Sequence, residues 1–439
     1  MRKKQVTQIL TVCSAAAVLM TGCGGSASTG NTGSNTKSAS SVTGSVSGNA
    51  AEGEKTTLNF YYWDEGQKEG MDAMIALFEE EHSDITVEST IVPWSEYWTK
   101  LQTSIPNGTG PDVFWMNLYI QPYIEAGLIY DMTDDIKNDG VDLSVFPESV
   151  LQVYQTDGHT YGIPKDYDGI SVFYNKEIFD EKNVDYPKEG WTWDDFEKSA
   201  KALTDDSHYG YAANPSAEIG YRSFMLSNGG AFTNKDYTEP LYNSAEDVEA
   251  LQFLHDMMYV SKCSPTASDM IEMDPGDMFI GGQVGMISDG SWSLSKYADA
   301  LGDQMGIMEM PGKVNNNTPT AGLALSISAK SSNTKAAMKF VEFAATKEAQ
   351  DATVSAAIPA NAESAGAWLA HYAEYPDAHY LIDSINESVS NPMYANGKTQ
   401  EGEQIMSDAI NNIWLDEHAD IQSAMDKVVS DLKAVINEK

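Results

Sequence analysis

Apolar and polar residues recur with two different periods in the part of the chain that follows residue 55. Every second residue is apolar over 57–63, which predicts a strand, and apolar residues at helical spacing over 71–78 predict a helix. The range 85–91 predicts a second strand, and 111–115 is a short apolar run that ends before a loop. Because strand, helix and strand alternate, the pattern indicates an α/β fold with a mostly parallel sheet.

Helical patterns become more frequent in the middle and at the end of the chain. Thr192 and Asp195 form a capping pattern, and an apolar helical face follows it. The remaining predicted elements are a helix at 245–259, strands at 284–288 and 323–328, a helix that ends near 344, and helical segments after 401. In the last segments, one apolar face contains Ile405, Ala409 and Ile413, and a second contains Ile421, Met425, Val428 and Leu432. No internal repeat is evident, and the length favours roughly two or three domains.

The beginning of the chain has the features of a secretory signal. Three basic residues precede an uncharged run over 9–20, which is shorter than the roughly 20 residues that span a bilayer. The run ends in Leu19-Met20-Thr21-Gly22-Cys23, which resembles the bacterial lipobox, although Met20 stands where leucine is usual. We therefore expect a signal peptide over 1–22 and a diacylglyceryl lipid, with acyl chains such as palmitate, on Cys23. The alternative is an ordinary signal peptide in which Cys23 occurs by chance.

A polar segment over 23–54, rich in Gly, Ser, Thr, Asn and Ala, follows the presumed anchor. Such a composition cannot bury enough apolar surface to fold, so we expect a flexible linker. The chain has three cysteines, and Cys13 falls in the signal. Cys263 would then have no partner in the mature protein, which favours a small buried side chain over a disulfide.

The charge of the chain narrows the choice of partners. Lys and Arg total 27 against 65 Asp and Glu, which gives a net charge of −38. A protein this acidic repels nucleic acid and anionic lipid, so neither is an expected partner. The motifs of metal and cofactor sites are not found either, and we expect no metal and no cofactor.

Seven short motifs follow one another in an order that resembles a known family. They are Gly110-Pro111-Asp112-Val113-Phe114-Trp115; Tyr161-Gly162-Ile163-Pro164 with Phe173-Tyr174-Asn175-Lys176; Thr192-Trp193-Asp194-Asp195-Phe196; Asn228-Gly229-Gly230; Gly282-Gln283-Val284-Gly285-Met286; Gly290-Ser291-Trp292; and the Gly322 strand with the Lys330 to Gln350 helix. Together they resemble the family 1 extracellular solute-binding proteins, the sugar-capturing components of ABC importers, similar to maltose-binding protein.

This resemblance implies a periplasmic-binding-protein-like fold of type II, in which two discontinuous α/β lobes are joined by a hinge and hold the ligand in a cleft between them. We expect lobe 1 over 55–165 and 319–357 and lobe 2 over 166–318 and 358–439. Ligand capture would close the lobes by bending the hinge. The resemblance also implies a monomeric lipoprotein on the extracytoplasmic face of the cell membrane, and the long polar linker and the lack of structural disulfides suit a Gram-positive surface. There it would deliver a sugar or oligosaccharide to permease subunits.

A sugar site needs aromatic rings against the C–H faces of the ligand, and carboxylates or amides against its hydroxyl groups. The resemblance places a stacking ring at Trp292 and a carboxylate at Asp168, beside Asp166 and Tyr167. Strand ends, where α/β sheets bind ligands, add Trp63, Trp115 and Asn117. The further candidates of lobe 2 are Tyr221, Arg222, Asn228 and Asp289.

Each of these residues also has an interpretation without a ligand. Trp292 could pack in the core of its lobe, Trp63 could cap a sheet edge, and Asp168 and its neighbours could be solvated at the hinge surface. Leu118 and Tyr119 stand where family members that bind malto-oligosaccharides commonly have acidic and basic groups, which argues against maltose itself.

Two other functions remain open on the sequence. The first is a binding protein for a non-sugar solute, such as a cation that the acidic surface would attract. The second is a surface glycan hydrolase, which needs two carboxylates on either side of a bond. We expect no enzyme, because the motifs of hydrolytic sites are not found. Paired carboxylates do not argue for a hydrolase, since they are unavoidable among 65 acidic residues.

Overall fold

The computed structural model describes residues 55–235, 237–386, 388–390, 394 and 397–437. Its two larger sheets have five and four strands. The signal, Cys23 and the linker predicted over 23–54 lie outside the described residues. Among the described residues, no helix has the length and apolarity needed to cross a membrane.

The first sheet has the strand order β2-β1-β3-β13-β6. Its strands are β1 (Thr56–Tyr62), β2 (Ile85–Ile91), β3 (Val113–Met116), β6 (Ile163–Pro164) and β13 (Ala324–Ile327). Strand β1 pairs in parallel with β2 and β3, whereas β13 is antiparallel to β3 and β6. The alternation over 57–63 and 85–91 therefore predicted the parallel part of this sheet correctly.

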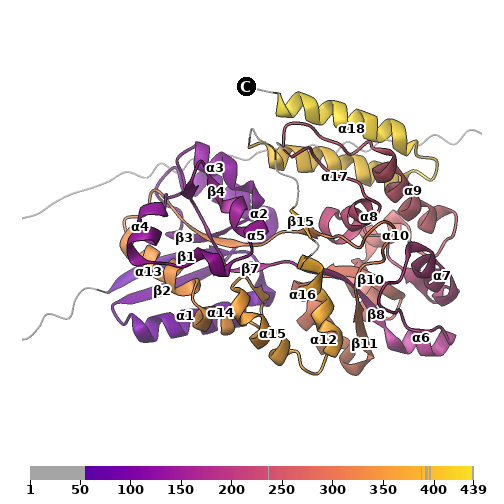
Figure 1. The fold of residues 1–439 in the computed structure, drawn as a ribbon, viewed down its shortest axis with the longest axis horizontal. Coiled ribbons are helices and arrows are strands. Elements are labelled where there is room, and N and C mark those ends of the chain that lie inside the picture. The colour runs from indigo at the N-terminus through magenta and orange to yellow at the C-terminus, as the bar shows by residue number, and fades with distance from the viewer. Residues whose placement is uncertain (1–54, 236, 387, 391–393, 395–396, 438–439) are drawn as a thin grey trace, which may run out of the picture. The chain divides into compact units, whose positions relative to one another are not determined.

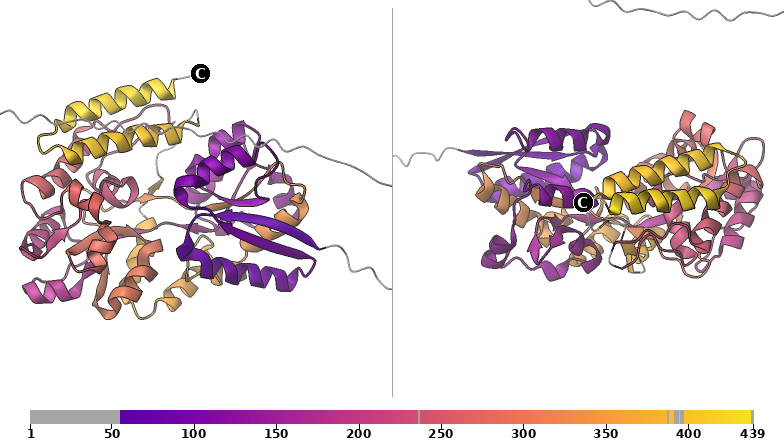
Figure 2. Two further views of the ribbon diagram at one scale, coloured as in Figure 1. Left: turned by 180° about the vertical axis from the view of Figure 1, so that it is seen from behind. Right: turned by 90° about the horizontal axis from the view of Figure 1, so that it is seen from above.

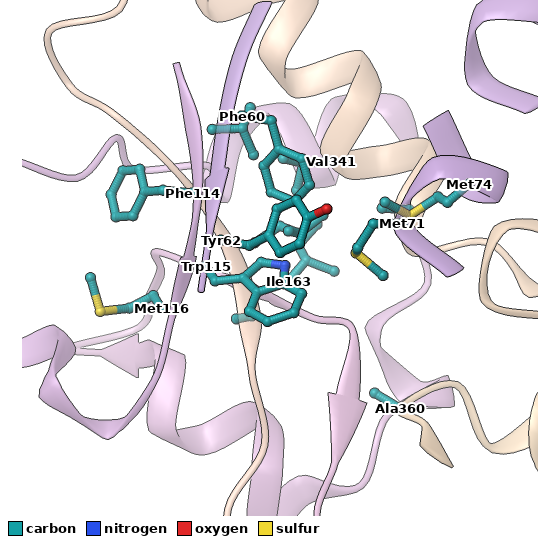
Figure 3. Close-up of a cluster of buried hydrophobic side chains, with 14 of the residues drawn as sticks. Phe60, Tyr62, Met71, Met74, Phe114, Trp115, Met116, Ile163, Val341 and Ala360 are labelled. Atoms are coloured by element: carbon teal, nitrogen blue, oxygen red, sulfur yellow. The ribbon is translucent and has the colours of Figure 1, made fainter. Parts of the chain in front are cut away.

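An aromatic cluster forms the core on one face of the first sheet. The rings of Phe60, on β1, and Phe78, on α1 (Lys68–Glu81), both contact Phe340 on α13 (Thr334–Ala344), at centroid distances of 5.5 and 5.0 Å. Figure 3 shows Phe60 and Tyr62 together with Met71 and Met74 of α1 and Val341 of α13. Each buried side chain of this size contributes about 1.5–3 kcal/mol of burial free energy.

Short helices complete the region around the first sheet. They are α2 (Trp94–Ser104), α3 (Gln121–Glu125), α4 (Thr133–Asp139), α5 (Glu148–Leu151) and α14 (Lys347–Asp351), with a hairpin of β4 (Gln155–Thr156) and β5 (His159–Thr160).

The second sheet has the order β11-β8-β10-β9 and is largely antiparallel. Its strands are β8 (Ile170–Asn175), β9 (Tyr209–Tyr211), β10 (Val284–Gly290) and β11 (Met305–Met308). Only β9 and β10 pair in parallel. The prediction of a mostly parallel sheet was therefore wrong here, because β8 and β10 are not joined by a strand-helix-strand crossover and run in opposite directions.

Helices pack on both faces of the second sheet. Val172, Tyr174, Met286 and Met308 belong to one hydrophobic core, and Phe173, Ile287 and Ile307 belong to the other. Neighbouring residues of a strand point to opposite faces, so both faces are covered. The helices of this region are α6 (Lys176–Lys182), α7 (Trp193–Leu203), α8 (Arg222–Ser227), α9 (Ala245–Tyr259), α10 (Ala267–Glu272), α11 (Pro275–Ile280) and α12 (Leu294–Leu301). The capping pattern at Thr192 is present as predicted, since both hydrogen bonds with Asp195 form.

Two long helices, α17 (Thr399–Leu415) and α18 (Ile421–Ile436), lie against each other at the end of the chain (Figures 1 and 2). The predicted face of α18 is buried. On α17, Ile413 is buried as predicted, whereas Ile405 and Ala409 are only half-buried and the neighbouring Met406 and Ile410 are buried instead.

Cys263 is free and fully buried, as its isolation in the sequence predicts. Burial raises the pKa of its thiol to about 12. A thiol held in its neutral form is a poor nucleophile, so this cysteine is a packing residue.

Three segments carry the chain between the regions of the two sheets. The first contains β7 (Asp166–Tyr167), the second β12 (Pro319–Thr320) and the third β14 (Ile358–Pro359). Strand β7 pairs with β14, and β12 pairs with β15 (Val389–Ser390). After β14 the chain forms α15 (Ala365–His371) and α16 (His379–Asn386), whose Trp368 and Leu381 belong to the hydrophobic core that the first sheet shares with one face of the second. The lobe boundaries expected from the sequence stay a prediction.

Candidate ligand-binding site

The segments that carry Asp168 and Trp292 are neighbours where the second sheet meets the first crossing segment. Strand β10 pairs with β8 so that Gly290 lies opposite Ile170. Beyond this pair, the backbone N–H of Ser291 donates to the carbonyl of Gly169 at 2.9 Å. The residues that follow Asp168 and precede Trp292 are thus hydrogen-bonded neighbours, although they are far apart in the sequence.

Glycine is required at position 169 for space. A Cβ atom on Gly169 would lie 1.9 Å from the carbonyl oxygen of Leu381, on α16. The close approach of these two backbones brings the start of β8 against α16 and places Asp168 at the edge of that contact.

The ring of Trp292 lies over the backbone of Gly290. A Cβ atom on Gly290 would lie 2.2 to 2.4 Å from three atoms of the six-membered ring. The φ of Gly290 is −92°, which other residues adopt readily, so the backbone conformation does not require a glycine here. The glycine instead gives the ring room to lie on the main chain, and Trp292 stays partly exposed.

The carboxyl of Asp168 lies in an environment that disfavours its charge. Burial raises its pKa well above the ordinary value of 3.8, the carboxylates of Glu218 and Asp166 raise it further, and Lys165 opposes them. The backbone N–H of Asp168 donates to the carbonyl of Ala321 at 2.9 Å, which ties it to the second crossing segment.

Glu218 was missed by sequence reasoning. It belongs to a short π-helix, η5 (Ala217–Tyr221), which is held against the second sheet by a hydrogen bond from the Ser288 hydroxyl to the carbonyl of Ile219. Nothing in the local pattern marks this residue, because its proximity to Asp168 depends on how η5 packs on β10.

A group of aromatic rings surrounds Trp63, which follows directly after β1. The Trp63 ring contacts those of Trp94, Tyr97 and Trp115 edge-on, at centroid distances of 5.2, 4.9 and 5.1 Å. Trp115 is fully buried, and Tyr97 donates its hydroxyl to the carbonyl of Trp115 at 2.8 Å. Trp63 is partly exposed and Trp94 is 47% exposed, so these two rings can meet a ligand.

Asn117 and Tyr119 continue this aromatic group beyond β3. The Asn117 side chain caps the 3-10 helix η2 (Leu118–Ile120) by accepting the backbone N–H of Tyr119 at 2.9 Å. The Tyr119 ring packs edge-on against Trp98 at 5.0 Å. Burial, Glu403 and Glu218 raise the pKa of the Tyr119 hydroxyl, and Arg222 lowers it. Tyr119 therefore lies between the aromatic rings of the first sheet and charged residues of the second region.

Arg222 and Glu403 form a buried ion pair beside Tyr119. One terminal nitrogen of the guanidinium lies 2.7 and 2.8 Å from the two carboxylate oxygens of Glu403, and it contacts the Tyr242 hydroxyl at 3.3 Å. The guanidinium carbon also lies 6.0 Å from the centre of the buried Tyr221 ring. These contacts fix the position of Glu403, which sequence reasoning did not select.

The other candidates have hydrogen-bond partners within the protein. Asp166 contacts Lys165 and accepts the backbone N–H of Leu323, and the buried Tyr167 lies on β7. Asp289 accepts hydrogen bonds from the Tyr297 hydroxyl and the backbone of Gly290, and Asn228 donates to Glu246 and Glu249 on α9. A ligand contact by any of these four residues stays a prediction.

The described residues contain no cluster of three or more His, Cys, Asp or Glu side chains suited to hold a metal ion. The site instead joins carboxylates with partly exposed aromatic rings, a combination that binds organic ligands through hydrogen bonds and stacking.

The raised pKa of Asp168 predicts how its replacement changes stability with pH. A carboxyl whose pKa is higher in the folded than in the unfolded protein lowers the free energy of unfolding as the pH rises above 3.8. Asp168→Asn removes this loss, so its stability relative to the wild type should increase with pH, by up to about 1.4 kcal/mol per pH unit in the titration range. Urea unfolding of both proteins between pH 4 and 8 measures the difference. Parallel pH profiles would contradict a raised pKa.

Comparison with known proteins agrees with this architecture. Residues 73–378 match the bacterial extracellular solute-binding protein family. A putative binding protein of Brucella abortus is 29% identical over 221 residues, 48% of this chain and 51% of that protein, so the chain spans about half the length of this relative. The multiple sugar-binding protein of Streptococcus mutans is 28% identical over 324 residues, 67% of this chain and 72% of that protein.

Solved structures have the same fold. An ABC substrate-binding protein of Listeria monocytogenes in complex with cycloalternan is 27% identical, with a TM-score of 0.80 over 88% of this chain and 100% of that chain. Maltose-bound MalE3 of T. maritima is 19% identical, with a TM-score of 0.75 over 87% of this chain and 100% of that chain. The second likeness shows the fold alone, and it confirms the α/β periplasmic-binding-protein class predicted from the sequence. With the family match covering most of the described residues, the chain belongs to the bacterial extracellular solute-binding proteins.

Proposed function

We propose that this protein captures a sugar or oligosaccharide outside the cell and delivers it to the permease of an ABC importer. The observation that carries the proposal is the backbone hydrogen bond from Ser291 to Gly169, which makes neighbours of the segments that carry Asp168 and the partly exposed Trp292. A carboxylate accepts hydrogen bonds from sugar hydroxyls, and an aromatic face packs against the C–H groups of a pyranose ring.

The first sheet offers the matching surface. One ring cluster contains three exposed or partly exposed aromatic residues, Trp63, Trp94 and Tyr119. Burial and the charges of Glu403 and Glu218 raise the pKa of the Tyr119 hydroxyl. We propose that the ligand binds between this cluster and the Asp168–Trp292 pair. Trp115 and Asn117 would support this wall from behind, since both are buried.

The comparisons support a carbohydrate as the ligand class. Relatives include the multiple sugar-binding protein of S. mutans and the cycloalternan complex of the L. monocytogenes protein, both of which match most of this chain. The two proposed lobes, 55–165 with 319–357 and 166–318 with 358–439, would close on the ligand by bending at the crossing segments.

A cationic solute is the second candidate, and one observation favours it. Asp168 and Glu218 lie close enough for the charge of Glu218 to raise the pKa of Asp168. Lys165 contacts Asp166, and Arg222 contacts Glu403, so both cations have acidic partners already. A positively charged ligand would compensate the two carboxylates, whereas a sugar would meet them with hydroxyl donors.

A thermal-shift screen separates these candidates. We expect mono- and oligosaccharides to include a ligand that, at 100 times its dissociation constant, adds about 2.7 kcal/mol to the free energy of unfolding. Polyamines and other organic cations form the second arm of the screen. Stabilisation by cations alone would favour the second candidate, and turnover of an oligosaccharide would contradict a purely binding role.

Trp292→Ala tests the stacking ring once the ligand is known. Loss of the aromatic face should weaken binding by about 1–3 kcal/mol, because its apolar contact area with the ligand is lost. Isothermal titration calorimetry measures the change. Tyr186→Ala is the matched control, since Tyr186 is an exposed aromatic residue that packs on Tyr174 and Phe179, outside the proposed site. Equal affinity of wild type and Trp292→Ala would remove this ring from the site.

We also propose that the protein is held at the cell surface by a lipid on Cys23. Cys23→Ser prevents acylation, so the protein should move from the membrane fraction to the medium when expressed in a Gram-positive host. Fractionation and immunoblotting measure its distribution. Mass spectrometry that found the wild-type amino terminus unacylated would contradict the anchor while leaving the sugar site intact.

A further inference from the structure

A buried ion pair, Lys165 with Asp166, lies at the point where the three crossing segments meet. Both residues are almost fully buried, with exposures of 5% and 2%. They stand at the end of β6 and the start of β7, where the chain first leaves the first sheet. Burial of two opposite charges costs free energy, because both groups lose their hydration. A buried pair at this position therefore calls for a structural or functional explanation.

Hydrogen bonds from the pair reach the other two crossing segments. The backbone N–H of Lys165 donates to the carbonyl of Leu323 at 2.8 Å, and the Asp166 carboxylate accepts the backbone N–H of Leu323 at 2.9 Å. The backbone N–H of Ala360 donates to the carbonyl of Lys165 at 3.2 Å. The backbone of Lys165 and the carboxylate of Asp166 therefore tie the first segment to the other two.

Gln350 on α14 adds hydrogen bonds to the place where the three crossing segments meet, which we call the joint. Its amide donates to the carbonyl of Pro164 at 3.1 Å and accepts the backbone N–H of Asn361 at 2.6 Å. The first and third segments are thus bridged on both sides of Lys165.

The Lys165 ammonium also reaches the aromatic cluster of the first sheet. It donates to the Gln67 side chain at 2.9 Å and lies 4.1 Å from the centre of the Trp115 ring. The Trp115 ring in turn packs edge-on against the partly exposed Trp63. A cation within 6 Å of a ring face is attracted by it, and the attraction is stronger when both groups are buried.

We propose that Lys165 is a positioning residue that couples the joint of the crossing segments to the ligand-binding face of Trp63 through the ring of Trp115. Movement of the crossing segments shifts the ammonium, and the ammonium holds the Trp115 ring that supports Trp63. The ion pair with Asp166 keeps the ammonium in place. This inference rests on the proposed ligand-binding site. It adds Lys165 to the residues that shape that site, although Lys165 itself contacts no ligand.

Three variants separate positioning from mere stability: Lys165→Met, Asp166→Asn and the double variant. Each single change leaves a buried charge without its opposite, so both should lower the midpoint of urea unfolding. The double variant removes both charges and should recover much of that midpoint. Its affinity for the ligand found in the screen should remain at least tenfold weaker than that of the wild type, because the cation over Trp115 is still absent.

Lys182→Met/Asp205→Asn is the matched control. Lys182 and Asp205 form an ion pair on the surface, and the change in charge is identical. This control should leave the affinity unchanged. Recovery of both stability and affinity in the Lys165→Met/Asp166→Asn protein would overturn the proposal and leave the pair a purely structural one.

Hydrogen exchange followed by mass spectrometry tests the coupling without a ligand. In the double variant, amides at 113–117 should exchange faster than in the wild type, together with those at 320–323, and the control should match the wild type. Faster exchange confined to 320–323 would overturn the link to Trp115. Failure of the wild type to bind any solute would contradict the proposed function, and the exchange experiment would still decide the positioning role.

Discussion

Backbone hydrogen bonds among the three crossing segments are the constraint on which the rest of this structure depends. Strand β7 pairs with β14, and the second segment is tied to the first by bonds from Lys165 and Asp168. Each segment continues at one end into the region of the first sheet and at the other into that of the second. A change at this joint therefore changes the relation between the two sheets. The joint is also where the candidate site begins, since Asp168 belongs to it.

Several charged side chains are buried around the site, and their burial lowers the stability of the fold unless a partner of opposite charge lies close by. Lys165, Asp166 and Arg222 are almost fully buried, and burial of a charge is tolerated only with a close partner. Lys165 meets Asp166, and Arg222 meets Glu403. Burial, and then the carboxylates of Glu218 and Asp166, raise the pKa of Asp168. A ligand that donates hydrogen bonds to this carboxyl would relieve part of that cost, so the same feature that lowers stability favours capture of a solute.

The aromatic side of the site shows how far sequence reasoning reached. Trp63 and Trp115 were selected because they end strands, and they do contact each other. Their neighbours Trp94 and Tyr119 were not selected, since each becomes part of the cluster only through the packing of α2 and η2 against the strand ends. Glu218 and Glu403 were missed for the same reason. Asn228 and Asp289 fit the motifs, yet both are hydrogen-bonded to residues of their own region.

The sequence by itself determined the class of fold and the burial of most element faces. These features depend on local periodicity and on motifs of a few residues, which remain readable without contacts. The tertiary structure alone decided that the second sheet is largely antiparallel, that Gly290 makes room for the Trp292 ring and that Lys165 lies over Trp115. The strand pairing and the contact of Lys165 with Trp115 depend on residues distant in sequence, and the position of the Trp292 ring depends on a side-chain conformation that the sequence pattern does not show.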